Sequence, residues 1–161
     1  MIKAIATLTV IAVGVLISTA LGTPSSGVTA ETARGPLAEL KLHGKFDNGA
    51  QVKLQTKGDI ELITQRIVAA PGATFGWHSH PGENVNVVLR GAITLYHDEA
   101  CTHGVTYGPG TTFTTSPDQV HLARNETGAE LVVFATYFAP RSSPPLPVRV
   151  DEASPGAGCP Q

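Results

Sequence analysis

Short runs in which apolar and polar residues alternate dominate the middle of the chain. Residues 40–43 read Leu-Lys-Leu-His and residues 52–55 read Val-Lys-Leu-Gln. A period of two is typical of a half-buried β-strand. Further runs rich in β-branched and aromatic residues lie at 60–70, 84–97, 111–115, 120–123 and 130–138. The pattern predicts about eight or nine short strands and no helix of useful length.

Glycine and proline separate these runs. The chain has 17 Gly and 12 Pro, and Pro71-Gly72 closes the run at 60–70. Arg90-Gly91 interrupts residues 84–97 and predicts a hairpin there, because glycine readily adopts a positive φ. Closely spaced strands without an internal repeat indicate an all-β domain, a sandwich or barrel of the jelly-roll group.

The N-terminal segment is predicted to lie outside the fold. Residues 1–22 have the layout of a secretory signal peptide: a positive start at Lys3, an apolar run, and small residues at Ala20 and Gly22. Cleavage after Gly22 is the first expectation and cleavage after Ala30 the alternative. An uncleaved membrane anchor is a further alternative, because the apolar run is long enough to span a bilayer. The expected location is therefore secreted or extracytoplasmic, with anchoring to the membrane left open.

The mature part is predicted to form one domain, since 161 residues do not comfortably make two. Residues 23–36 are interpreted as a polar linker, residues 37–140 as the barrel and residues 141–161 as an irregular C-terminal tail. Export favours a disulfide between Cys101 and Cys159, with two free thiols as the alternative. The net charge of -2 and the lack of a basic run argue against a nucleic-acid partner.

His78-Ser79-His80 is the most informative of the histidine positions. Residues two apart on a strand point to the same face, so both imidazoles would converge on one point, as a metal requires. The following Pro81-Gly82 turn places the pair at a strand end. The histidines interpreted instead as surface or loop residues are His43, His97 and His103.

The spacing around these histidines resembles the two motifs of the cupin family. Gly72 precedes His78 by five intervening residues, and His121 and Asn125 follow Gly110 at the distances of the second motif. Ser116 and Asp118 stand where that motif has Pro and Gly. The chain resembles small exported single-domain bacterial cupins, which implies a single jelly-roll (cupin) barrel. The resemblance also implies a divalent metal held inside the barrel by His78, His80 and His121.

The acidic ligand of the family is displaced in this chain. Asn84 occupies the family's Glu position, and Glu83 lies one residue early. Glu83 is kept as a candidate ligand beside the three histidines, because a bulge at Pro81-Gly82 could turn it inward. Asn84 through its carbonyl oxygen, or a water molecule, are the alternatives. Histidine ligands suit Zn, Fe, Mn, Ni or Cu, and an uncompensated +2 charge favours a small anionic ligand or substrate.

Other residues are assigned to the pocket or to packing. One of Gln65 and Arg66 is expected to face the barrel interior, where an arginine could bind a carboxylate. Trp77 is expected to pack opposite His78, and Asn125 is interpreted as the structural asparagine of the second motif rather than a glycosylation site. Core or pocket-wall positions are assigned to Phe134, Thr136 and Phe138.

Three functions stay open from the sequence, with no catalytic residue identified. The chain is a metal-dependent enzyme, a non-catalytic protein that binds a small ligand, or a structural domain with a vestigial metal site. Fold does not decide among them. A homodimer is a further arrangement that the sequence leaves open.

Overall fold

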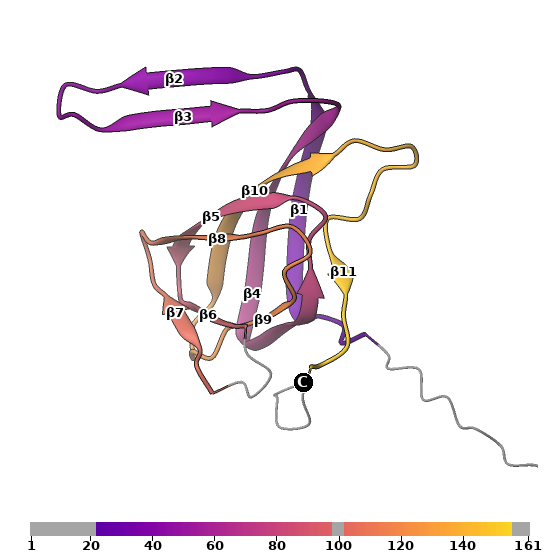
Figure 1. Ribbon diagram of the computed structural model, residues 1–161. Coiled ribbons are helices and arrows are strands. Elements are labelled where there is room, and N and C mark those ends of the chain that lie inside the picture. The colour runs from indigo at the N-terminus through magenta and orange to yellow at the C-terminus, as the bar shows by residue number, and fades with distance from the viewer. Residues whose placement is uncertain (1–21, 98–101, 156–161) are drawn as a thin grey trace, which may run out of the picture.

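The computed structural model describes residues 22–97 and 102–155 (Figure 1). Every regular element in these ranges is a strand, which confirms the all-β prediction. The strands are β1 (Ser26–Leu37), β2 (Lys41–Lys45), β3 (Gln51–Gln55), β4 (Ile60–Ser79), β5 (Glu83–Arg90), β6 (Ile93–Tyr96), β7 (Val105–Tyr107), β8 (Thr112–Thr115), β9 (His121–Arg124), β10 (Leu131–Pro140) and β11 (Val150–Asp151).

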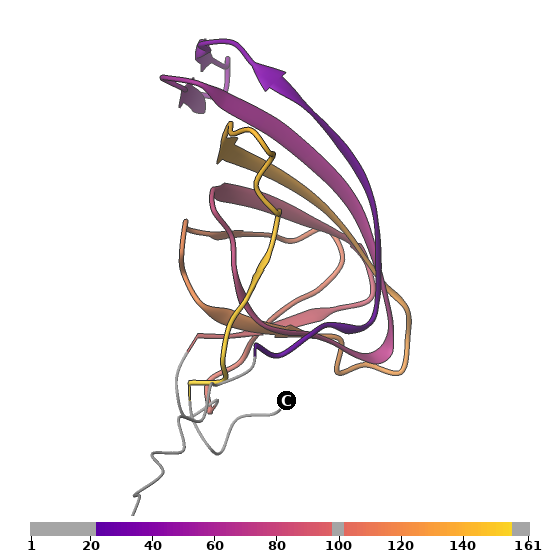
Figure 2. The same cartoon turned by 90° about the vertical axis from the view of Figure 1, so that its right-hand side faces the viewer.

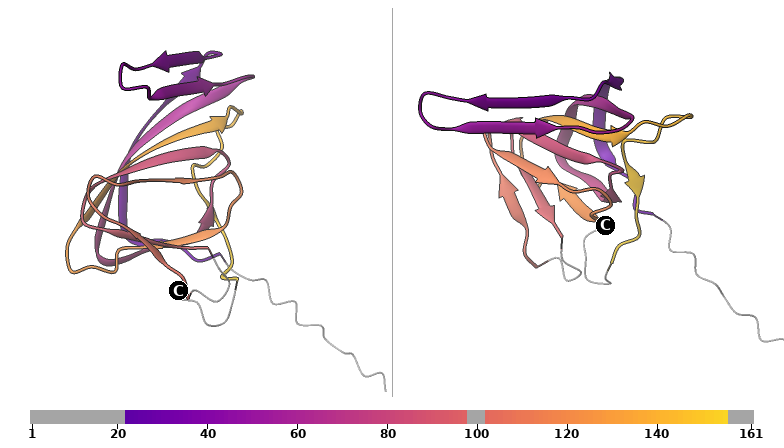
Figure 3. Two further views of the ribbon diagram at one scale, coloured as in Figure 1. Left: turned by 60° about the vertical axis from the view of Figure 1, so that its left-hand side comes forward. Right: turned by 45° about the horizontal axis from the view of Figure 1, so that its top comes forward.

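One antiparallel sheet makes the barrel. Its strands follow the order β7-β6-β9-β4-β10-β5-β8, and β1 and β11 also pair with β4. The sheet curls until it is nearly closed, so that one face of each strand looks into a common interior (Figure 2; Figure 3). This architecture confirms the predicted jelly-roll barrel.

Strand β4 is the longest strand of this sheet and pairs with four others. It continues for 20 residues, through the Pro71-Gly72 pair that was expected to end it. Gly72 and Gly76 take φ values of 74° and 67°, and the pairing with β9 shifts register between Thr74 and Gly76. Such irregularities bend a strand without removing it from the sheet. The first half of β4 therefore pairs with β1 and β10, and its end pairs with β9 and β11.

The hairpin predicted around Gly91 is wrong. Strand β5 lies between β10 and β8, whereas β6 lies between β9 and β7. Gly91 has the expected positive φ of 72°, but a Cβ there would lie 2.6 Å from the carbonyl oxygen of Glu130. Gly91 therefore lies in the connection between β5 and β6, which have different neighbours in the sheet. Its backbone passes close to the start of β10.

Two segments assigned outside the barrel belong to its sheet. Residues 26–36, most of the segment 23–36 interpreted as a linker, form β1 together with Leu37, and β1 pairs with β4 along most of its length. Their side chains are mostly exposed, as on an edge strand, which explains why no alternating pattern marks them. The chain after β10, interpreted as an irregular tail, runs down the side of the barrel to β11, which pairs with the end of β4 (Figure 2).

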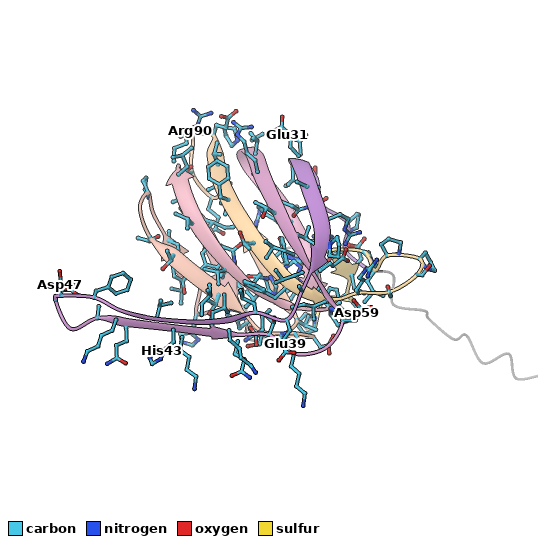
Figure 4. All side chains as sticks on the ribbon, turned by 90° about the horizontal axis from the view of Figure 1, so that it is seen from above. Glu31, Glu39, His43, Asp47, Asp59 and Arg90 are labelled. Carbon is cyan, nitrogen blue, oxygen red and sulfur yellow. The ribbon has the colours of Figure 1, made fainter. Side chains whose placement is uncertain are left out.

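Strands β2 and β3 form a separate two-stranded hairpin that projects from the barrel (Figure 1). Figure 4 shows His43 pointing away from the barrel, in agreement with its predicted surface position. The opposite face of the hairpin carries Leu42, Phe46 and Val52, all exposed. The alternating pattern thus predicted these strands correctly but not their place outside the barrel.

The core fills the barrel interior with apolar side chains from every part of the main sheet. On β10 the inward residues are Val133, Ala135 and Tyr137. Phe134 is 41% exposed on the other face, so the core position predicted for the Phe134, Thr136 and Phe138 face is wrong. The prediction chose the opposite face of this strand, since both of its faces carry aromatic residues.

Some predictions concern residues outside the described ranges. The signal peptide or membrane anchor of residues 1–22 lies there except for Gly22, and so does the proposed Cys101–Cys159 disulfide. Among residues 22–97 and 102–155 no helix is long and apolar enough to cross a membrane.

Candidate metal centre

Three histidines meet inside the barrel. His78 lies near the end of β4, His80 directly follows that strand, and His121 begins β9. His78 and His121 are paired across the two strands, which brings their ring centroids to 4.2 Å. One ligand atom from each of the three residues lies within 4.8 Å of the others, and all three side chains are buried. The structure thus brings together the three predicted ligands.

Backbone carbonyls fix the tautomer of each ring. The Nδ1 atom of His78 lies 2.8 Å from the carbonyl oxygen of Gly76, and that of His121 lies 2.9 Å from that of Gln119. The Nδ1 atom of His80 lies 2.7 Å from the carbonyl oxygen of Val148. A carbonyl only accepts, so each Nδ1 carries the hydrogen and each neutral ring keeps the lone pair of Nε2 free for a metal. The donor set therefore fits a divalent transition metal.

Burial keeps these rings neutral. It is the main cause that lowers the pKa of His78, His80 and His121, in the last case to about 4. The neighbouring imidazoles lower the pKa of His78 and His121 further, because a second positive charge in the cluster is repelled. Neutral imidazole is the form that binds metal, so the site is prepared for a ligand role at neutral pH.

We expect the metal-free protein to lose stability as the pH falls from 7 to 4. The unfolded chain binds a proton at each histidine near pH 6.5, whereas folded His121 binds one only near pH 4. Over this window the unfolded state takes up more protons, so His121 alone should lower the free energy of unfolding by roughly 3 kcal/mol at pH 4. Urea unfolding with a chelator present, followed by fluorescence of Trp77, the chain's one tryptophan, measures the change.

A His121→Gln variant should show a smaller loss between pH 7 and pH 4 than the wild type. His43→Gln is the matched control, because His43 is exposed on the hairpin. An identical pH dependence in His121→Gln and the wild type would contradict the argument.

The histidines face a cavity of about 210 Å³ in the barrel interior. Its wall combines apolar side chains of the core with the polar side chains of Gln65, Asn84, Asn86 and Thr115. Gln65, not Arg66, is the member of its pair that lines the cavity, and it donates to the Thr32 hydroxyl. An open position at a metal held by His78, His80 and His121 would therefore face this cavity.

Asn84 faces the interior and Glu83 does not. Asn84 is 2% exposed and lines the cavity, whereas Glu83 is exposed and does not line it. The Asn84 carbonyl oxygen accepts from the Asn86 amide at 2.5 Å and from the Thr115 backbone N–H at 3.3 Å. Its amide donates to the Thr115 hydroxyl at 2.5 Å. Asn84 is thus fixed by hydrogen bonds to Asn86 and Thr115 along the cavity wall. Glu83 points outward, as expected for the neighbouring residue on a strand.

The second motif takes the conformation that its family spacing implies. Asp118, at the motif's Gly position, has a φ of 57°, and its backbone N–H donates to the carbonyl oxygen of His80. Asn125 is fully buried and its amide donates to the carbonyl oxygens of Ala69, Ala70 and Ala129. The structural interpretation of Asn125 agrees with this burial, because a buried amide is not available to a glycan.

Trp77 packs on the face opposite the histidines. It is fully buried against Leu122 and Tyr96, in a cluster separate from the main core. This agrees with the packing position expected for it, and it shows that β4 supports the site with one face and a second cluster with the other.

Sequence reasoning missed three contributors to the site. The Val148 carbonyl orients His80, and Arg149 lines the cavity beside it. Arg149 donates to the carbonyl oxygens of Phe75 and of Thr23, and its Nε donates to Asp151 at 2.6 Å. His97 is exposed at the end of β6, with its ring centroid 5.8 Å from that of His121. None of these positions matches a motif, and two lie in the segment interpreted as an irregular tail.

A family model described as "Cupin domain" matches residues 65–137. No curated protein matches the chain. A cupin 2 conserved barrel domain protein from Salinispora arenicola is 21% identical, with 47% of this chain and 61% of that chain covered and a TM-score of 0.42. This chain therefore spans less than two thirds of that protein's length.

Two further solved structures are similar at the same level. An uncharacterized conserved protein with a double-stranded β-helix domain from Klebsiella pneumoniae is 21% identical, with 68% of this chain and 77% of that chain covered and a TM-score of 0.40. A predicted oxalate decarboxylase from Thermotoga maritima is 20% identical, with 52% and 83% covered and a TM-score of 0.42. The family model spans the two strands that supply His78 and His121, the loop that supplies His80 and the strand that carries Tyr137. Residues 65–137 are thus a cupin domain.

Proposed function

We propose that this chain binds one divalent transition metal through His78, His80 and His121 and presents it to a small anionic molecule in the barrel. The observation that carries the proposal is the set of three Nδ1 hydrogen bonds to backbone carbonyls, which leaves three Nε2 atoms free at one point. Packing alone does not require three buried imidazoles to share the same tautomer and to direct their Nε2 atoms to one point. When bound, the metal would supply a Lewis acid with open coordination positions.

The charge of the site supports an anionic ligand. Three neutral imidazoles leave the +2 charge of the metal uncompensated. The Arg149 guanidinium at the cavity wall is paired with Asp151, so the metal is the main source of positive charge. Among the described residues that line the cavity there is no carboxylate. The ligand itself would therefore provide the compensating negative charge. Zn, Fe, Mn, Ni and Cu all suit histidine ligands, and the donor set does not select one.

A non-catalytic binding protein is the second candidate function. Apart from the histidines and Arg149, the polar side chains of the described cavity wall are amides and hydroxyls. Amides and aliphatic hydroxyls do not act as general acids or bases near pH 7, and burial raises the pKa of the Tyr137 phenol, so it is protonated there. Catalysis would therefore depend on the metal, whereas binding needs only the cavity.

Export of the chain is part of the proposal. Cleavage after Gly22 would keep Thr23, whose hydroxyl accepts from the Trp77 backbone N–H at 2.5 Å and whose backbone nitrogen donates to the Glu152 carbonyl. Cleavage after Ala30 would remove Thr23 and the first part of β1. The first site is therefore the one we propose, with the Cys101–Cys159 disulfide expected in the exported protein.

A zinc titration of the full-length chain, stripped of metal and held at pH 7, tests the metal site. The wild type should bind one equivalent. Glu83→Ala should bind as the wild type does, because Glu83 is exposed on the outer face of β5. Asn84→Glu should bind more tightly by at least about tenfold, the smaller end of the changes that outer-shell partners of a metal cause. A carboxylate at this inward position adds the charge compensation that an amide lacks.

Absence of stoichiometric zinc in the wild type would contradict the proposed function. A large loss in Glu83→Ala with no gain in Asn84→Glu would instead mean that the loop after His80 rearranges and that Glu83 is the fourth ligand. A competing chromophoric chelator in each titration gives the affinities on one scale.

A further inference from the structure

The cavity is chiefly apolar away from the histidines. The side chains that form this part of the wall are Ile67, Phe75, Ile93, Leu95, Phe113 and Val133. An apolar cavity of about 150 Å³ is enough to hold benzene. The 210 Å³ available here therefore suits one small ring, or a branched chain of similar size, together with a polar head at the metal.

The polar groups on the same wall already satisfy one another. Asn86 donates to Asn84, Asn84 donates to Thr115, and Gln65 donates to Thr32 on β1. A ligand gains little from replacing such internal bonds, since each replacement exchanges one hydrogen bond for another. The amide side chains of Gln65, Asn84 and Asn86 consequently need no second polar group on the ligand to satisfy their hydrogen bonds.

The single charged side chain on the described cavity wall is also occupied. Arg149 is paired with Asp151 and donates to the carbonyl oxygens of Phe75 and Thr23. A second anionic group on the ligand would lie among apolar side chains without a cation of its own. Burying an unpaired charge in such surroundings is strongly unfavourable.

Tyr137 contributes a buried hydroxyl to the cavity wall. Tyr137 lines the cavity on β10, is 5% exposed, and has its ring centroid 5.1 Å from that of His80. Its hydroxyl makes no hydrogen bond to any residue in the ranges 22–97 and 102–155. A phenol is protonated at neutral pH and can donate one hydrogen bond. A donor that faces a cavity and finds no protein acceptor is normally satisfied by a ligand or a water molecule, so an acceptor is expected in the cavity beside the three histidines.

We infer that the site selects a small monoanion with a compact apolar body, of the class of monocyclic aromatic carboxylates, and that Tyr137 is its specificity-determining residue. The inference rests on the proposed function for the metal contact: one carboxylate oxygen lies at the metal and accepts from the Tyr137 hydroxyl. The ring occupies the apolar part of the cavity. A small dicarboxylate is disfavoured, because its second charge finds no free cation.

Calorimetric titration of the zinc-loaded full-length chain with benzoate, acetate and succinate at pH 7 tests the inference. Burial of the ring should make benzoate bind about tenfold to a hundredfold more tightly than acetate. Succinate should bind no more tightly than acetate. In Tyr137→Phe the affinity for benzoate should fall about tenfold, as expected for a lost hydrogen bond to a charged group. The zinc content should not change.

Tyr96→Phe is the matched control, because the Tyr96 hydroxyl donates to Glu126 and does not line the cavity. This control should bind benzoate as the wild type does. Succinate binding more tightly than benzoate, or an unchanged benzoate affinity in Tyr137→Phe, would overturn the inference while leaving the metal site intact.

Failure of the metal site has a different signature. If the wild type takes up no zinc, the proposed function is wrong, and phenol binding by the metal-free chain then tests the cavity alone. Binding of phenol that weakens in Tyr137→Phe would support the apolar site with its hydroxyl donor. No binding of phenol would overturn the inference together with the proposed function.

Discussion

Replacing His121 with alanine is expected to lower the affinity of the chain for a divalent transition metal by more than about 100-fold, beyond what loss of an outer-shell partner costs. His121 supplies one of the three free Nε2 atoms, and its Cα pairs with that of His78 across β4 and β9. Two histidines separated by one residue cannot surround a metal by themselves. The same loss is expected for His78→Ala and for His80→Ala.

Two matched variants distinguish a histidine that binds the metal from one that only lies near the site or elsewhere on the surface. His43→Ala removes an exposed histidine of the hairpin and should leave the affinity unchanged. His97→Ala removes an imidazole whose charge helps lower the pKa of His121 but that does not belong to the group of three. Its effect should be small. Metal content by elemental analysis and the visible absorption of the cobalt-loaded protein are the readouts.

The outcome that contradicts this assignment is retention of stoichiometric cobalt by His121→Ala with an unchanged spectrum. An equal loss in His97→Ala and His121→Ala would instead add His97 to the ligands. In that case a set of four histidines would replace the three-histidine site.

The three-histidine site could be predicted from sequence because local geometry determines most of it. His78 and His80 share a face since they are two residues apart on a strand. The same alternation gives Asn84 to the interior and Glu83 to the outside. His121 is different, because its place opposite His78 depends on pairing between β4 and β9. Only the spacing of the second cupin motif pointed to it.

The parts that escaped prediction depend on long-range pairing. Strand β1 has no alternating pattern because both of its faces are mostly exposed, so nothing in its own residues distinguishes it from a linker. Strands β5 and β6 have the pattern of a hairpin, yet each finds its neighbours elsewhere in the sheet. Short-range rules cannot decide between a glycine that closes a hairpin and one that crosses the barrel.

The C-terminal segment was missed for a further reason. Its contact with His80 is made by the Val148 carbonyl oxygen, which every residue type possesses. A side-chain pattern therefore carries no signal for it. Arg149 could have been noticed, because it lies two residues from Asp151, to which it is paired. The segment contacts Thr23 at the start of the described chain through Arg149, and it pairs with the end of β4 through β11.

Replacing Asn125 with alanine is expected to lower the free energy of unfolding by about 3 kcal/mol or more, because several buried backbone groups lose their partners at about 1–3 kcal/mol each. Its amide bridges the carbonyl oxygens of Ala69, Ala70 and Ala129, and its own oxygen accepts from the Thr127 N–H at 3.1 Å. These bonds join the residue after β9 to the bend of β4. Chemical denaturation of the metal-free protein measures the loss.

Asn48→Ala is the control for an exposed asparagine in a turn. Its side-chain oxygen accepts from the Ala50 backbone N–H at the tip of the hairpin, in solvent, and its removal should cost less than about 1 kcal/mol. Comparable losses in Asn48→Ala and Asn125→Ala would contradict the structural role of Asn125.

Asn125→Asp distinguishes the donor from the acceptor half of this side chain. An aspartate keeps the oxygen that accepts from Thr127 but removes the amide that donates to Ala69 and Ala70, and it turns a buried negative charge toward those carbonyl oxygens. The variant should therefore be at least as unstable as Asn125→Ala at pH 7 and should recover part of the loss at pH 4, where the carboxyl can be protonated. Because Asn125 follows His121 by four residues and anchors β9 against β4, both variants should also weaken metal binding, though less than His121→Ala does. Full metal affinity in an Asn125 variant that has lost its stability would separate the two roles and show that β9 is held in register by the β4–β9 pairing alone.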